Sequence, residues 1–360
     1  MLFFYRPRLS IQGWYHAKEK PKQMEYASLN QLKTNHSEDG KGTGERESSD
    51  QVFTPFDLPS NVQAEVLKDD DDEMDPKDLV FLSSFINDTY LKPASIREIR
   101  QRFEEESSVQ LRHFFNDKWE NEVKTRLMKE DGDQSVGRGE PSLNYSIGIS
   151  DDCKIVGPAH KQRYLEYVGI SKASGGSCGA ILSHLKNELF QSPQFGRLLK
   201  HYSSLGMPLG YKGNVRRFRP GLDYTIAHYG ILTKQPVLDA TMCFVCGSGK
   251  QSLGEEGDDE DDILWQSDDT GGFECYISAD DDEAHSEEAA DEYDEEDDTK
   301  LLSVSASNNT LSLVYRDPGT MKFVKYVGSG APSSRWDICL EYEVLDDEDD
   351  DKEDEGKVTQ

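Results

Sequence analysis

The stretch from Leu301 to Val344, LLSVSASNNTLSLVYRDPGTMKFVKYVGSGAPSSRWDICLEYEV, decides the expected fold. It holds several short runs rich in β-branched and aromatic residues, which are typical of β-strands. Asn308-Asn309 predicts one hairpin turn within it, and Asp317-Pro318-Gly319 predicts a second. A series of short strands joined by turns indicates a sandwich, a barrel or a jelly roll.

The strand pattern begins upstream of this stretch, after Gly210. Three further segments carry it: VRRFRPGLDYTIAHYGIL (215–232), VLDATMCFVC (237–246) and GGFECYISAD (271–280). The acidic residues at about 254–300 fit a long loop inserted between two of these strands. The C-terminal part of the chain is therefore expected to be mostly β.

Before Gly210 the apolar residues recur at helical spacing, which predicts helices that flank the strands. The predicted helices are 79–90, one that starts at the capping box Ser95-x-x-Glu98, 111–127, 164–168, 181–190 and one that starts at Ser192-Pro193. In the polar segment before them, Phe53, Phe56 and Leu58 are the residues expected to pack against a neighbouring element.

The residues RPRLSIQGWYHA (6–17) predict a β-strand at the beginning of the chain, with no neighbouring strand predicted to pair with it. Its pattern recurs near the C-terminus, where the spacing of Arg8, Ser10, Ile11 and Tyr15 is repeated by Arg335, Asp337, Ile338 and Tyr342. We therefore expect two copies of one β-domain, of which the first contributes only its closing strand. The expected parts are a remnant strand at 1–17, a polar and acidic linker at 18–78, a β-domain with N-terminal helices at 79–345 and an acidic tail at 346–360.

The charge of the chain is strongly acidic. Its 360 residues include 40 Lys and Arg and 70 Asp and Glu, which gives a formal net charge of -30. This balance disfavours direct binding to the DNA phosphate backbone, because such binding needs clustered Lys and Arg. The acidic residues lie in blocks, at 69–75, 255–262, 280–298 and 346–355. Like charges within a block repel one another, so we expect the blocks to be solvated loops or tails. The alternative is that they bind a basic protein.

Targeting signals are not evident. No apolar run reaches membrane-spanning length, and Arg6 and Arg8 follow MLFFY too closely for a signal peptide. The six Cys are scattered, unlike the dense spacing of a secreted disulfide scaffold. These features predict an intracellular protein, in the nucleus or the cytoplasm, with no membrane association.

The pattern His-x-Asp/Glu with a distant second His suits Fe(II). His36 and His285 each have Glu two residues on, but both lie in polar segments without a strand that could hold the ligands still. His228 lies on a predicted strand, where Gly230 replaces the carboxylate, so we interpret it as a core or surface histidine. The sequence thus offers no metal site and no catalytic residue.

Cys243 and Cys246 form a lone C-x-x-C in a predicted strand. Residues three apart on a strand point to opposite faces, so the two thiols are not expected to share a metal. We interpret them as small buried residues, with a redox pair as the alternative.

The segments quoted above resemble one known family. PRLSIQGWYHA (7–17) is similar to the closing strand of the catalytic domain in the 2-oxoglutarate- and Fe(II)-dependent prolyl 3-hydroxylases that act on a small-subunit ribosomal protein. The segments from Arg216 to Val344 resemble the C-terminal degradation domain of the same family. The resemblance implies a double-stranded β-helix, or cupin-like jelly roll, for each domain, with iron only in the first.

The resemblance also implies roles for particular residues. Arg8, with Ser10, would bind the C5 carboxylate of 2-oxoglutarate, and the iron ligands would lie upstream of Arg8. Fe(II), 2-oxoglutarate and ascorbate serve the family, and we expect this chain to bind none of them. A truncated product, a misannotated start and a short isoform are the three explanations that stay open.

Two functions of different classes follow. In the first, the parent protein is a prolyl 3-hydroxylase linked to translation termination, and this chain is inactive alone. In the second, residues 79 to 345 act as a binding module for a small-subunit ribosomal protein or another basic protein, and we favour this for the chain itself. A further alternative is an acidic chaperone or scaffold that binds a basic partner through its charge.

Overall fold

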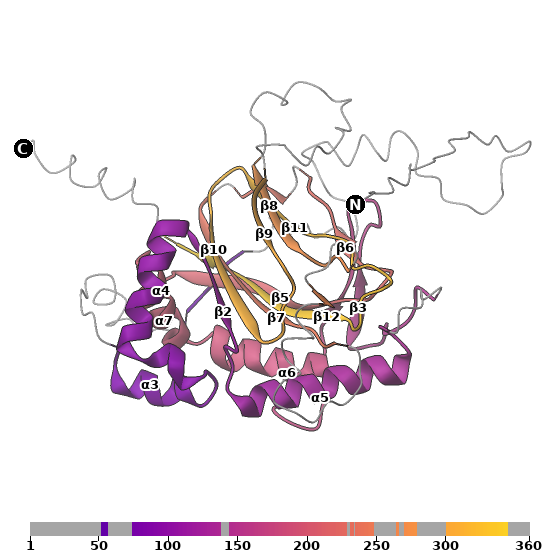
Figure 1. Cartoon of the computed structure of the whole chain (residues 1–360), viewed down its shortest axis with the longest axis horizontal. Helices are drawn as coiled ribbons and strands as arrows, with labels where there is room; N and C mark the ends of the chain where they lie inside the picture. Colours follow the sequence, from indigo (N-terminus) through magenta and orange to yellow (C-terminus); the bar gives the residue numbers. More distant parts are fainter. Residues whose placement is uncertain are drawn as a thin grey trace, which may run out of the picture. The chain divides into compact units, whose positions relative to one another are not determined.

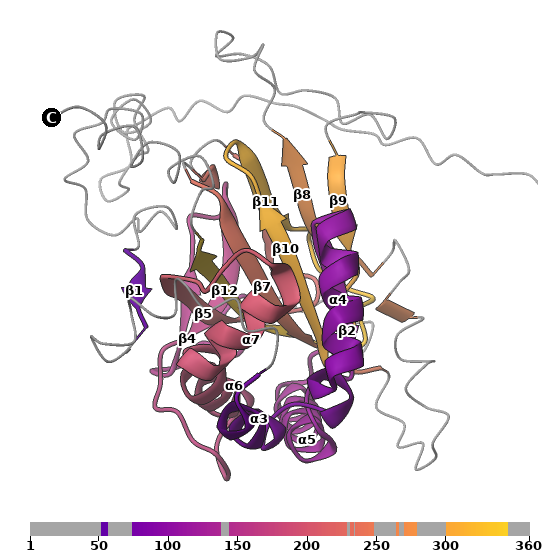
Figure 2. The ribbon, with the colours of Figure 1, turned by 90° about the vertical axis from the view of Figure 1, so that its left-hand side faces the viewer.

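The chain is described by a computed structural model that covers residues 52–56, 74–137, 144–228, 231–233, 235–247, 264–265, 270–278 and 300–344. Within these ranges it forms two antiparallel sheets, with helices packed against one of them (Figures 1 and 2). Arg8 and Ser10 lie outside the described residues, as does the rest of the strand predicted at 1–17.

The larger sheet, here called the main sheet, contains nine strands. They are β1 (Thr54–Pro55), β2 (Ser108–Arg112), β3 (Cys153–Val156), β4 (Gln162–Tyr167), β5 (Gly210–Phe218), β6 (Tyr224–Thr225), β7 (Val237–Phe244), β10 (Thr310–Arg316) and β12 (Arg335–Glu343). The order across it is β2-β10-β7-β12-β5-β4-β3, with β1 paired to β5 and β6 paired to β4.

The second sheet contains three strands, β8 (Glu274–Ser278), β9 (Lys300–Val304) and β11 (Thr320–Val324), in the order β11-β8-β9. The backbone N–H of Val324 donates to Oγ1 of Thr225 at 2.6 Å, which also ties β6 to this sheet. From β5 onward the chain therefore winds between two layers: β7, β10 and β12 return to the main sheet, and β8, β9 and β11 lie in the second. This winding is that of a double-stranded β-helix, or jelly roll, as the sequence predicted.

The helices pack on the face of the main sheet that points away from the second sheet (Figure 1). They are α3 (Pro76–Ser83), α4 (Pro93–Glu106), α5 (Asp117–Gln134), α6 (Cys178–Leu185) and α7 (Pro193–Ser203), with a 3-10 turn η2 (Asp88–Leu91) and a π turn η3 (Lys186–Phe190). The side chains of Asp75, Asn116, Ser177 and Ser192 each cap a helix by accepting a backbone N–H. Of the helices in the described part of the chain, none is both long and apolar enough to span a membrane.

The helices predicted at 181–190 and from Ser192-Pro193 are confirmed by α6, η3 and α7. The helix predicted at 79–90 is two helices, because Ile86 pairs in a β-bridge with Phe115 and interrupts it. The capping box at Ser95 is wrong, since α4 starts two residues earlier at Pro93, whose fixed φ suits the first helical position.

Strand pairing overrides local periodicity in two other predicted helices: the helix predicted at 111–127 is confirmed by α5 except at its start, and the one predicted at 164–168 is wrong. Leu111 belongs to β2, which pairs with β10, and the helix predicted from it starts only at Asp117. The helix predicted at 164–168 is the strand β4, which pairs with β3 and β5.

The two predicted hairpin turns exist as turns but do not form hairpins. Asn309 has a positive φ of 45°, and the Thr320 N–H donates to the Asp317 carbonyl at 3.2 Å. Each turn nevertheless carries the chain from one sheet to the other, since β9 and β11 lie in the second sheet and β10 lies in the main sheet. The sequence pattern identified the reversals but not the layer in which the next strand pairs.

Within the predicted linker, Phe56 is buried at the main sheet. Its ring contacts those of Tyr211 and Tyr342, with centroids 5.1 and 6.2 Å apart. The expected packing of Phe56 is confirmed, while Leu58 lies outside the described residues.

Candidate functional site: an ion network inside the β-helix

Side chains on β12 alternate between two buried environments, as they must on a pleated strand. Trp336, Ile338 and Leu340 join the apolar core beneath the helices. Arg335 and Asp337 project from the opposite face, toward the second sheet, and are 2% and 0% exposed. Strand β7 alternates in the same way, with Leu238, Ala240 and Met242 in the core and Asp239 and Thr241 on the inner face. The space between the sheets is therefore lined by charged side chains.

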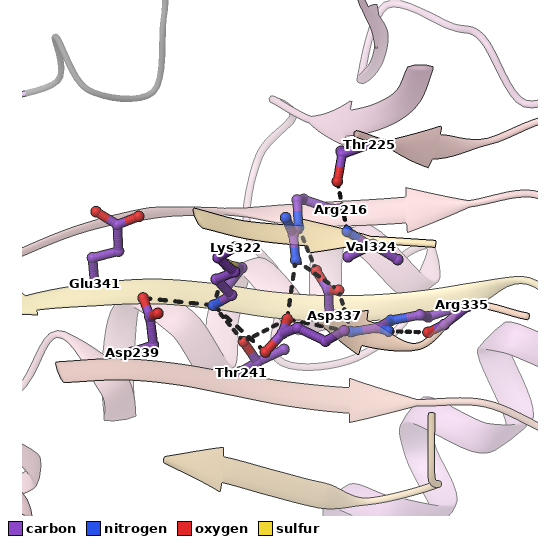
Figure 3. A network of polar contacts seen from close by, with 12 residues as sticks. Arg216, Thr225, Asp239, Thr241, Lys322, Val324, Arg335, Asp337 and Glu341 are labelled. Atoms are coloured by element: carbon purple, nitrogen blue, oxygen red, sulfur yellow. Dashed lines mark hydrogen bonds and ion pairs between the residues drawn. The ribbon is translucent and has the colours of Figure 1, made fainter. Parts of the chain in front are cut away.

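Arg216 and Asp337 form a two-bond ion pair in this space (Figure 3). Nε of Arg216 donates to Oδ1 of Asp337 at 2.7 Å, and its Nη2 donates to Oδ2 at 3.0 Å. Nη2 of Arg335 lies 3.2 Å from the same Oδ2. The bidentate geometry fixes the orientation of both Arg216 and Asp337.

Glu274, at the start of β8, is surrounded by cations from both sheets. Nζ of Lys322 lies 3.6 Å from its Oε1, and the guanidinium groups of Arg335 and Arg216 lie 3.6 and 3.8 Å from its Oε2. Two hydroxyls donate to the carboxylate: Tyr276 to Oε1 at 2.8 Å and Thr241 to Oε2 at 3.1 Å. Glu274 thus joins five side chains in one cluster.

A second centre of ion pairs lies around Arg316, at the end of β10. Nε of Arg316 is 2.9 Å from Oδ2 of Asp239, and its Nη2 donates to Oε1 of Glu341 at 2.8 Å. Lys322 links the two centres, because its Nζ is 3.6 Å from Oδ1 of Asp239 and donates to Thr241 at 3.0 Å. Lys212 pairs with Glu341 at 3.0 Å.

We call this cluster the interior ion network: Lys212, Arg216, Asp239, Glu274, Arg316, Lys322, Arg335, Asp337 and Glu341, with the hydroxyls of Thr241 and Tyr276. Buried carboxylates are tolerated only when they are paired. Asp239, Glu274 and Asp337 are buried and Glu341 is partly buried, and each of the four has at least two cationic neighbours.

The network shifts the pKa values of its members. Burial alone would raise the pKa of Glu274, but Lys322, Arg335 and Arg216 outweigh it and lower that pKa to about 2. Burial dominates at Asp239 and raises its pKa despite Arg316 and Lys322. Burial would lower the pKa of Lys322, yet Asp239 and Glu274 raise it. Glu274 is thus held as a carboxylate and Lys322 as an ammonium.

The interior does not fit Fe(II). A non-haem iron site needs imidazole and carboxylate ligands with free lone pairs and open coordination positions. The interior ion network contains no His, and its carboxylates face Arg and Lys. Within the described ranges, no group of three or more His, Cys, Asp or Glu has a metal-binding arrangement. Between β6 and β11, a hydrogen bond from Val324 to Thr225 joins the strands directly.

Of the candidate ligands from the sequence, His36 and His285 lie outside the described residues. His228 was predicted on a strand, which is wrong, because β6 ends at Thr225 and His228 follows it.

The interpretation of the C-x-x-C pair is confirmed. Cys243 and Cys246 are both buried and not disulfide-bonded, and they pack in two different apolar clusters. Burial raises the pKa of the Cys243 thiol to about 11. Both therefore serve as small apolar core residues.

Reasoning from the sequence missed the interior ion network. Its signal was present in β12, where Arg335, Asp337 and Glu341 alternate with apolar residues. Such alternation is typical of a strand with one face in water, so nothing in it indicated that the charged face is also buried.

The strand order and the charged interior define the class of protein as a double-stranded β-helix protein with an ion-paired interior. Residues 77–351 match the family described as "Oxoglutarate and iron-dependent oxygenase degradation C-term". The chain belongs to this family.

Two curated relatives are similar to nearly the whole chain. "Prolyl 3,4-dihydroxylase OGFOD1" of Ostreococcus tauri is 32% identical over 94% of this chain and 59% of its own length. "Prolyl 3-hydroxylase sudestada1" of Drosophila melanogaster is 25% identical over 94% of this chain and 50% of its own length. The chain thus spans between half and three-fifths of these relatives.

Among solved structures, a Trichoplax adhaerens prolyl hydroxylase in complex with a hypoxia inducible factor oxygen degradation domain peptide matches 81% of the chain. It has a TM-score of 0.38 and 12% identity, and the match covers 100% of that chain. The fold assignment itself rests on the strand order described above.

Proposed function

We propose that the β-helix domain at residues 79–345 is a protein-binding module of a 2-oxoglutarate- and Fe(II)-dependent prolyl hydroxylase, and that it does not itself perform the oxidation. The observation that carries this proposal is the interior ion network. Charged side chains of the chain itself line the space between the sheets and pair with one another, so the domain offers its outer surface rather than its interior for function.

For the parent protein, we propose the chemistry of the family. O2 would be the oxidant: with Fe(II) bound, one of its oxygen atoms would enter succinate as 2-oxoglutarate loses carbon dioxide, and the other would become the hydroxyl group of the proline, with ascorbate as a supporting reductant. Arg8 and Ser10 would hold the C5 carboxylate of 2-oxoglutarate. The proposed substrate is a small-subunit ribosomal protein, the proposed process is translation termination, and the proposed location is the nucleus or the cytoplasm.

The partner chemistry follows from charge. With a net charge of -30, the chain favours basic proteins and disfavours DNA. Small-subunit ribosomal proteins, which must bind RNA, present the complementary charge.

The test uses the 360-residue chain in two assays. In the first, Fe(II) and 2-oxoglutarate are added, and bound iron and released succinate are measured. We expect neither, and stoichiometric iron with turnover would contradict the proposal. In the second, purified small-subunit ribosomal proteins are titrated singly at physiological salt, and saturable binding of at least one is expected. Failure of every one to bind would contradict the binding-module role.

The acidic chaperone is a second candidate, favoured by the acidic block at 280–298. A variant with all Asp and Glu of this block replaced by Ser and Gln separates the two functions. A chaperone that works through charge would lose its partner in this variant. A β-helix binding surface would keep it, with a weaker salt dependence.

A further inference from the structure

Glu274 differs from the other carboxylates of the interior ion network in the number of strands that converge on it. Its neighbours come from β5, β7, β11 and β12 as well as from its own strand β8. Both sheets thus contribute, and both carboxylate oxygens are used. Asp239, by contrast, contacts two cations, Arg316 and Lys322.

The backbone that carries Glu274 is held by the same cluster. Nη1 of Arg335 donates to the carbonyl of Gly272, two residues before Glu274. Gly271 has a φ of +69°, and a Cβ there would lie 2.0 Å from the Tyr326 carbonyl oxygen, so the approach to β8 is possible only with glycine. The backbone conformation at Gly271 and the hydrogen bond at Gly272 therefore position the Glu274 carboxylate among the cations.

Each of the three cations also has a neighbour other than Glu274. Arg216 and Arg335 both contact Asp337, and Lys322 contacts Asp239 and Thr241. In addition, Nε of Arg335 is buried and has no hydrogen-bond acceptor within the described part of the chain. The hydrogen-bonding capacity of the Arg335 guanidinium is therefore only partly used.

We propose that Arg216, Lys322 and Arg335, with the hydroxyls of Thr241 and Tyr276, form a carboxylate-binding site whose ligand is the side chain of Glu274. The chain thus supplies its own anion in the interior of the β-helix. When that side chain is shortened, the site takes a free carboxylate no larger than formate or acetate. A compact charged anion is required, because the hydroxyls and cations must be satisfied within the volume of one carboxylate.

The experiment measures thermal unfolding of Glu274→Ala in sodium formate or acetate and in sodium chloride of equal ionic strength. We expect a lowered Tm in chloride and a saturable rise in formate of roughly 3–6 °C at about ten times its dissociation constant. The wild-type protein should show no saturable shift. A Glu274→Ala variant that behaves alike in both salts, whether folded or unfolded, overturns the proposal.

Two further variants make the result specific. Asp131→Ala removes a buried carboxylate that pairs with Arg217 and Ser334 outside this interior, and we expect a smaller formate effect there. An equal effect would mean that any buried carboxylate deletion can be rescued, which contradicts a built site. Lys322→Met added to Glu274→Ala should weaken formate binding at least several-fold, and unchanged affinity would remove Lys322 from the site.

Discussion

Arg216 on β5 and Asp337 on β12 lie directly opposite each other in the strand register, and they form a bidentate ion pair in the interior between the two sheets. Cross-strand neighbours are the closest side-chain partners that a sheet provides. Asp337 is fully buried, so the attraction between the two charges must compensate for the hydration that they lose.

Replacement of Asp337 by Ala should lower the free energy of unfolding by about 3–5 kcal/mol, because it leaves Arg216 and Arg335 with less counter-charge. The measurement is urea unfolding followed by circular dichroism. The double variant Arg216→Met/Asp337→Ala should cost less than the sum of the two single changes, since the pair is then removed as a unit.

The matched control is the exposed pair Arg102 and Glu106 on α4, whose side chains are 62% and 51% exposed. Its removal should change the free energy of unfolding by no more than about 0.5 kcal/mol. An equal loss in the free energy of unfolding at the two pairs would show that burial does not strengthen the contribution of the Arg216–Asp337 pair to stability.

The stability of the protein should depend on pH through Glu274. Its pKa falls from the ordinary 4.5 in the unfolded chain to about 2 in the fold. The carboxylate therefore contributes stability above pH 4.5, and that contribution is lost as the pH falls toward 2. The shift corresponds to roughly 3 kcal/mol.

Glu274→Gln should accordingly be least stable relative to wild type at neutral pH, and the difference should shrink between pH 4.5 and 3. Urea unfolding of both proteins across this range measures it. A difference that stays constant with pH would contradict a lowered pKa at Glu274.

Gly271 and Gly319 offer a matched pair of glycines with positive φ, at +69° and +83°. Alanine at either position carries the cost of a left-handed backbone, about 1 kcal/mol. At Gly271 the added Cβ would also lie 2.0 Å from the Tyr326 carbonyl oxygen, whereas nothing lies within 4 Å at Gly319. Gly271→Ala should therefore lower Tm clearly more than Gly319→Ala. Equal losses would show that the β8 turn can relax.

Thiol chemistry should distinguish the native from the unfolded protein. Burial raises the pKa of Cys243 to about 11, so the reactive thiolate is scarce at neutral pH. A thiol reagent followed by peptide mass spectrometry should label Cys243 slowly in buffer and rapidly in urea. Mild oxidation should not join Cys243 to Cys246. Rapid labelling in buffer, or such a disulfide, would contradict their separate buried positions.

The sequence predicted much of the fold but little of the candidate site. The strands after Gly210 and the helix start at Ser192-Pro193 followed from local signals, because turn residues and caps act over a few positions. The start of the helix predicted at 111–127 and the whole helix predicted at 164–168 were wrong, because Leu111 pairs with the distant strand β10 and Tyr164 pairs with the neighbouring strand β3. The functional expectations for Arg8 and Ser10 stay predictions.

The sequence by itself determined the alternation along β7 and β12, because successive side chains on a strand point to opposite faces. It therefore set which residues share a face, such as Arg335 with Asp337 and Asp239 with Thr241. Only the tertiary structure decided that this face is buried. The second sheet covers it, and brings Glu274 and Lys322 from distant parts of the chain against it. A charged face that is buried and a charged face that is exposed to water have the same sequence pattern, because they differ only in whether another element packs against them.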